Sequence, residues 1–166
     1  MSNNEKHMEF IADLLKERIY ATFALVAVLV SIDPEHTTPF HASLFVAGTI
    51  LSLWAASIIA AQMSQRLVFQ DAKNHDRELR ISLLRHSAML YALPLPLLLI
   101  GLAHINLIGL QDAIHLSTVS SFLLFTLWTV RSAKTIQASK IAIALLIILQ
   151  ALFIIGTISL KVFVSH

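Results

Sequence analysis

The chain has 166 residues with a formal charge of +2, and 57% of its residues are hydrophobic while only 13% are charged. Its mean hydropathy of +0.76 and its low charge exclude an ordinary water-soluble domain, which has about 45–50% apolar and ~25% charged residues. The absence of cysteine excludes disulfides, thiolate metal sites and thiol nucleophiles. The long apolar runs predict one all-α integral membrane domain, residues 1–166, built as a bundle of five transmembrane helices.

Five stretches are long enough to cross the roughly 30 Å hydrocarbon core, for which ~20 residues are needed. The predicted spans cover about residues 10–32, 40–64, 82–103, 112–131 and 141–164. The first span begins among mixed acidic and basic residues, a pattern that argues against a cleaved signal peptide, so we expect it to remain as an anchor. Asp33-Pro34 should end it, and Thr38 should cap the second span with Pro39 at its first helical position.

The second span carries a stripe of small residues at every fourth position. The stripe consists of Gly48, Ser52, Ala56, Ala60 and Ser64. Small residues in this register let the backbone of another helix approach closely. We therefore expect the stripe to be a helix-packing surface, either at the centre of the bundle or at the interface of a homo-oligomer.

A charged segment at 65–80 follows the second span and should lie outside the bilayer core. Eleven of the twelve Lys and Arg residues fall in the N-terminal region, in 65–80, in the turn at 131–140 or at the adjoining helix ends; Lys161 is the exception. Because basic residues stay on the cytoplasmic side, the pattern predicts a cytoplasmic N-terminus and an extracytoplasmic C-terminus for five spans.

The third span contains Pro94 and Pro96 near its middle. Each proline lacks an N–H and clashes with the carbonyl four residues earlier, at Leu90 and Ala92. Irregular backbone at membrane depth persists only against protein or a watery cavity, and transporters place ion sites there. These four residues are therefore a candidate midplane ion site, and the alternative is a structural kink.

The fourth span is rich in serine and threonine, and the fifth is apolar except for Gln150. The hydroxyls either line a hydrophilic path or bond back to their own helix, and Gln150 is expected to join two helices. Asp112 is expected to cap the fourth span.

Two clusters of polar residues lie near the predicted membrane surfaces. The outer cluster, a candidate divalent-metal site whose alternative is ordinary loop and capping residues, comprises His36, His41, His104, Asp112 and His115. The inner cluster comprises Glu17, Arg18, Arg66, Arg80, Arg85 and His86. Charges inside a membrane are functional candidates by default. Arg85 lies deepest and should pair with Glu17, unless its side chain snorkels to the headgroups.

Enzyme motifs are missing: there is no HExxH, no G-x-S-x-G and no glycine-rich phosphate loop. We therefore expect no enzyme activity, no cofactor and, given the mixed charge of 65–80, no nucleic-acid partner. The sequence favours a small oligomeric multi-pass protein of the cytoplasmic membrane that forms a channel or carrier for an ion, preferentially a small cation. The alternative is a non-transporting scaffold or sensor that binds a cytosolic protein through 65–80.

Overall fold

The computed structural model describes residues 3–68, 75–135 and 139–164, and no strand occurs within these ranges. Their helices, in chain order, are α1 (Asn3–Ser31), α2 (Pro39–Val68), α3 (His75–His86), the 3₁₀ helix η2 (Ser87–Ala92), α4 (Pro94–His104), α5 (Leu110–Thr135) and α6 (Lys140–Val164). The prediction of an all-helical fold is confirmed for these residues.

Four helical stretches in the described residues are long and apolar enough to cross a bilayer. They are Pro39–Ser64, Ile81–His104, Leu110–Thr135 and Lys140–Thr157. Helix α1 is not among them, because Lys16, Glu17 and Arg18 interrupt its apolar run. The chain therefore has the helices of a multi-pass membrane protein.

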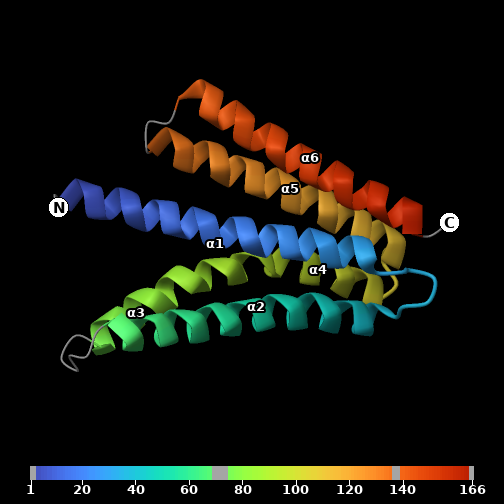
Figure 1. Cartoon of the computed structure of the whole chain (residues 1–166). Coiled ribbons are helices and arrows are strands. Elements are labelled where there is room, and N and C mark those ends of the chain that lie inside the picture. The colour runs from blue at the N-terminus through green and yellow to red at the C-terminus, as the bar shows by residue number, and fades with distance from the viewer. Residues whose placement is uncertain (1–2, 69–74, 136–138, 165–166) are drawn as a thin grey trace.

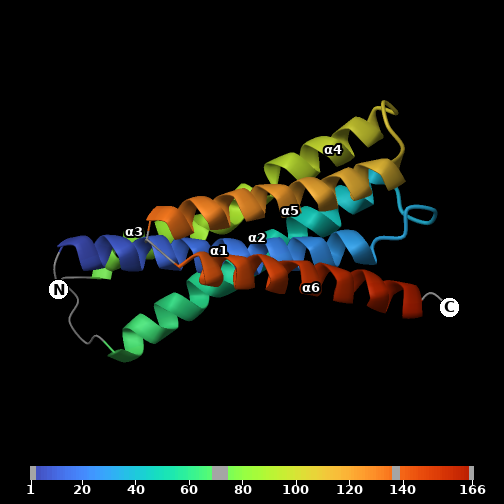
Figure 2. The same ribbon diagram turned by 90° about the horizontal axis from the view of Figure 1, so that it is seen from above.

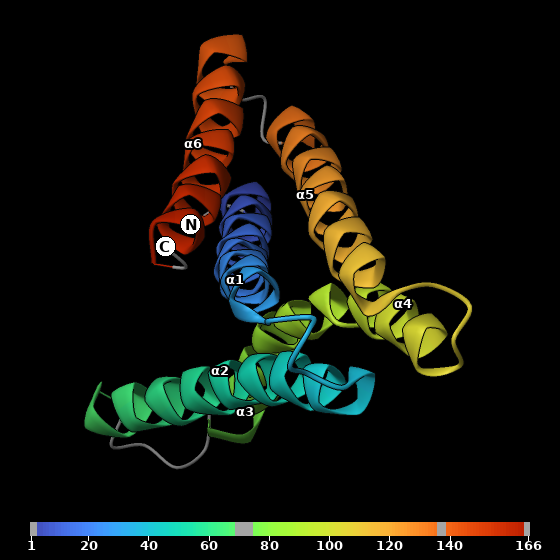
Figure 3. The same cartoon turned by 90° about the vertical axis from the view of Figure 1, so that its right-hand side faces the viewer.

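Helix α1 occupies the centre of the molecule. It packs against α2, α3, η2, α5 and α6, and it lies between α2 on one side and α5 and α6 on the other (Figure 3). Ala21, Leu25 and Leu29 repeat every fourth residue, so they share one face of α1, and all three are buried in the main core. Helix α2 contributes Val46 and Ile50 to that core from the edge of the bundle.

The long helices lie side by side and alternate in chain direction (Figure 1). The α1–α2 and α4–α5 connections lie at the end of the molecule that holds the C-terminus, whereas α2 and α5 end near the N-terminus. Seen from above, α4 lies alongside α5 (Figure 2), in agreement with the close packing of these two helices.

The first turns of α2 and α5 test the two helix caps that the sequence predicts. The predicted cap of α2 is confirmed: the His41 N–H donates to Thr38 Oγ1 at 3.3 Å, and Pro39 is the first helical residue. Helix α5 begins at Leu110 rather than at Asp112, and the Ala113 N–H donates to the Gly109 carbonyl at 2.9 Å. Asp112 therefore lies inside the first turn, where its charge suits the helix dipole, and the prediction that it caps the helix was wrong.

The third predicted span is divided at the prolines. Helix α3 tightens into η2, and α4 begins at Pro94. The Leu93 N–H donates to the Leu90 carbonyl at 3.1 Å, a bond between residues three apart that is typical of a 3₁₀ turn. The break is therefore present as expected, but the Leu90 carbonyl has found a partner in its own turn.

Candidate functional site

Two acidic residues of α1 face two basic residues of α3 near the N-terminal end of the bundle. Arg85 Nη1 lies 2.8 Å from Asp13 Oδ2, and His86 Nδ1 lies 3.2 Å from Glu17 Oε1. Asp13 and Glu17 are four residues apart and share a helix face. The expected Arg85–Glu17 pair is therefore replaced by Arg85–Asp13, and Glu17 pairs with His86.

The two pairs differ in burial. Asp13 and Arg85 are each about a third exposed, whereas Glu17 is only 8% exposed. His86 Nδ1 and Glu17 Oε1 lie 3.2 Å apart but are not aligned as a hydrogen bond, so Glu17 Oε2 and His86 Nδ1 are buried without a hydrogen-bond partner among the described residues. Burial of a carboxylate with incomplete hydrogen bonding is costly, so this pair is the strongest candidate site in the charged cluster.

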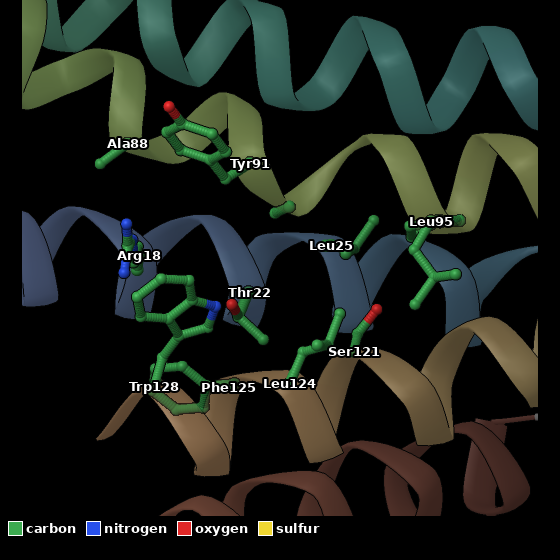
Figure 4. Close-up of a pocket in the computed structure, with 12 residues that line it drawn as sticks. Arg18, Thr22, Leu25, Ala88, Tyr91, Leu95, Ser121, Leu124, Phe125 and Trp128 are labelled. Carbon is green, nitrogen blue, oxygen red and sulfur yellow. The ribbon is translucent and has the colours of Figure 1, made fainter. Parts of the chain in front are cut away.

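A cavity lies between α1, η2, α4 and α5, and two of its lining residues, Arg18 and Ala88, are close in sequence to Glu17 and His86. It offers about 50 Å³ to the centres of water molecules, more than the roughly 10–15 Å³ that a cavity needs to hold one water. Its polar lining includes Arg18, Thr22 and Ser121, and Figure 4 shows Arg18 between Tyr91 from η2 and Trp128 from α5. The guanidinium carbon of Arg18 lies 3.9 Å from the centroid of the Trp128 ring and 5.7 Å from that of Tyr91.

The four residues of the candidate midplane site are divided between the cavity and its surroundings. Ala92 and Pro96 line the cavity, Leu90 packs against the main core and Pro94 is exposed. Residues on both sides of the helix break thus contribute to one wall of the cavity.

Sequence reasoning singled out Glu17, Arg18, Arg85 and His86, but it missed Asp13, Tyr91 and Trp128. Asp13 and Glu17 lie four residues apart on one face of α1, and Arg85 and His86 are consecutive near the end of α3. Two acidic residues close together on one helix and two basic residues close together on another are a sequence signal for the two pairs. Nothing in the sequence pairs Arg18 with aromatic rings from two other helices. The side chains of Arg66 and Arg80 lie outside the described residues, so their place in the inner cluster stays a prediction.

The small-residue stripe of α2 is exposed and lies outside the main core, although Gly48, Ser52 and Ala56 line an open groove with Ala24 of α1. All five of its members are exposed: Gly48, Ser52, Ala56, Ala60 and Ser64. Within one protomer the packing face of α2 is instead the one that carries Ala42, Val46 and Ile50. The stripe does not pack at the centre of this bundle, and a contact with a second copy stays a prediction.

The outer polar residues are not assembled into a metal site. The described residues contain no group of three or more His, Asp or Glu side chains that could hold a metal ion. His36 Nδ1 lies 2.7 Å from Asp33 Oδ2, and His41 Nδ1 lies 2.9 Å from Thr38 Oγ1. The hydrogen bond and charge of Asp33 raise the pKa of His36, which favours the imidazolium form that cannot ligate a metal. His104, Asp112 and His115 are exposed.

Comparison with known proteins identifies no relative of this chain. Models of protein families, curated proteins and solved structures give no match to the chain. The chemistry available is that of a buried acid–imidazole pair and of a small cavity that contains one guanidinium.

Proposed function

We propose that the chain is a five-span protein of the cytoplasmic membrane, with a cytoplasmic N-terminus, that conducts or carries a small cation. Helix α1 supplies the fifth span in this proposal, because it runs antiparallel to α2 in the middle of the four apolar stretches (Figure 1). Its charges are tolerable there if they face protein rather than lipid, and Glu17 does so.

The observation that carries the proposal is the buried Glu17–His86 pair. Inside a membrane, chains of acidic and histidine side chains are typical of proton pathways. The ring nitrogens of histidine can donate or accept a proton, and His86 Nδ1 lies 3.2 Å from Glu17 Oε1, close enough for an exchange once the two groups align. The cation that this site fits best is therefore the proton.

The charge of Arg18 supports this choice among cations. A metal ion that had to reside in the cavity would meet the guanidinium at short range, and like charges repel strongly where water is scarce. A proton resides on the Glu17–His86 pair itself and does not need the cavity as a binding site.

The test is proton uptake by liposomes that contain the purified protein and a trapped pH-sensitive dye, driven by a potassium diffusion potential. We expect the wild type to take up protons faster than protein-free liposomes. Glu17→Gln and His86→Gln should each reduce uptake to the protein-free rate, because neither side chain can then complete the exchange. Asp13→Asn is the matched control, since it removes a carboxylate one turn away in the exposed pair and should leave uptake near the wild-type rate.

Two results would contradict the proposal. Undiminished uptake in Glu17→Gln would show that the pair is only structural. Wild-type uptake equal to that of empty liposomes would exclude proton transport and favour the alternative, a scaffold or sensor that meets a cytosolic protein through 65–80.

A further inference from the structure

Arg18 has no acidic partner among the described side chains, whereas Arg85 and His86 each lie beside a carboxylate. Arg85 is paired with Asp13, and Glu17 with His86, but Arg18 makes no ion pair with a described residue. Its Nε is buried without a hydrogen-bond partner there. The ring of Trp128 covers the guanidinium, which provides a cation–π contact but accepts no N–H hydrogen bond. The cavity thus holds a positive charge with unused donors.

The remaining cavity wall is apolar. Leu25, Leu95 and Phe125 contribute to it. A guanidinium recognises phosphate through two parallel hydrogen bonds, so the polar end of the cavity matches a phosphate while its apolar wall matches a hydrocarbon chain.

The cavity opens towards the outside of the helix bundle. Tyr91 is 72% exposed and Trp128 is 43% exposed at its mouth. A second groove on α5 shares Leu124 and Trp128 with the cavity and continues to Arg131 and Lys134. Arg18 in the cavity and Arg131 and Lys134 in the groove therefore form a row of positive charges along one side of the molecule.

The depth of this site suits a lipid headgroup. Arg18 precedes Ser31, the end of α1, by 13 residues, or about 20 Å at 1.5 Å per residue. Helical side chains lean towards the N-terminus of their helix, which moves the guanidinium further from the Ser31 end. In a hydrocarbon core of roughly 30 Å, the guanidinium then lies close to the headgroups on the N-terminal side.

We propose that this cavity binds the phosphate of an anionic membrane lipid, with Arg18 as the primary contact and Arg131 and Lys134 as flanking charges. The acyl chain lies against the apolar wall beside the helix break. Basic pockets between membrane helices recognise lipid headgroups in this manner. The site is separate from the Glu17–His86 pair and does not depend on proton transport, but its depth rests on the proposal that α1 crosses the membrane.

The experiment uses Trp128 as a reporter. The chain has two tryptophans, and Trp54→Phe leaves Trp128 alone; the Trp54 Nε1 has no hydrogen-bond partner among the described residues to lose. The protein is reconstituted in vesicles of unlabelled phosphatidylcholine that contain increasing fractions of phosphatidylglycerol or phosphatidylcholine with brominated acyl chains. Bromine quenches tryptophan emission on contact, so the lipid fraction at half-maximal quenching measures occupancy of the site.

We expect phosphatidylglycerol to reach half-maximal quenching at a fraction about tenfold lower than phosphatidylcholine, as for a charge-assisted hydrogen bond. Arg18→Gln should remove this preference. The matched control is Lys16→Gln, which removes a charge from the same end of α1; the Lys16 ammonium lies 5.9 Å from the Tyr20 ring centroid and outside the cavity, so the preference should persist. Loss of the preference in both variants would indicate attraction to the surface charge alone and would overturn the site.

Two further arms use the protein with Arg18 intact. Unlabelled phosphatidylglycerol should displace the brominated form and restore emission, and failure to do so would overturn the proposal even if Arg18→Gln does not fold. Inorganic phosphate at millimolar concentration should leave the quenching unchanged. Displacement by inorganic phosphate would assign the cavity to a free anion and would contradict a lipid site.

Discussion

Asp13 and Glu17 show how neighbouring residues on one helix face acquire different roles from their surroundings. Asp13 meets Arg85 where both side chains are about a third exposed, so solvent screens their attraction. Glu17 lies one turn further along α1, is buried, and has one oxygen unpaired among the described residues. The two carboxylates are chemically alike, and burial together with the neighbouring His86 makes Glu17 the candidate for proton exchange.

A double-mutant cycle tests the pairing of Arg85. Asp13→Asn and Arg85→Gln should each lower thermal stability slightly in one detergent, and their coupling should be about 1 kcal/mol or less, as for exposed ion pairs. Glu17→Gln combined with Arg85→Gln should show a smaller coupling, because His86 and not Arg85 contacts Glu17. A larger coupling with Glu17 than with Asp13 would restore the pairing that the sequence suggested.

The sequence suggests α2 as the central helix of the bundle, but the structure places α1 at the centre and α2 at the edge (Figure 3). Helix α2 is apolar throughout its candidate span and carries the small-residue stripe, yet it lies at the edge of the bundle and exposes that stripe. Helix α1 carries charges, yet it lies at the centre and contacts helices on both sides. In a membrane the central position can suit the less apolar helix, since protein neighbours can satisfy its polar groups and lipid cannot.

Ala56 and Ile58 provide a test of the exposed α2 stripe. Ala56→Leu should leave helical content unchanged, because Ala56 is exposed on the protomer, but it should lower the oligomeric state in detergent if the stripe meets a second copy. Ile58→Leu is nearly volume-conserving and should have little effect on either. Size-exclusion chromatography with light scattering measures both, and equal oligomeric states in the two variants would remove the stripe as an interface.

The whole molecule has its loops and ends sorted to two opposite sides (Figure 1). The ends of α2, α5 and the start of α6 lie on the side of the N-terminus, and most of the basic residues of the sequence lie in or next to these regions. The arrangement follows the positive-inside rule if that side is cytoplasmic.

Reporter fusions test this orientation and the crossing of α1. A reporter after His166 should be extracytoplasmic, and one inserted near Lys73 should be cytoplasmic. A reporter before Met1 should report the same side as Lys73, because two spans, α1 and α2, separate these points. An N-terminal reporter on the opposite side from Lys73 would show that α1 does not cross the membrane.

At the scale of the whole chain, the sequence by itself determined the helical class, four of the five predicted apolar stretches, the cap at Thr38 and the break at Pro94. These features depend on local composition, on helix rise per residue and on groups that proline lacks, so they can be inferred from neighbouring residues alone. The orientation inferred from Lys and Arg is of the same kind and awaits the reporters.

Only the tertiary structure decided which side chains meet. Arg85 could reach either Asp13 or Glu17 by sequence spacing, and the rotation and relative height of α1 and α3 selected Asp13. The cavity combines Arg18, Tyr91 and Trp128 from three helices, and no periodicity within one helix encodes such a meeting. The stripe of α2 fits a contact inside or outside the protomer equally well, because small residues permit close approach from either direction; the packing of Val46 and Ile50 against α1 left it exposed.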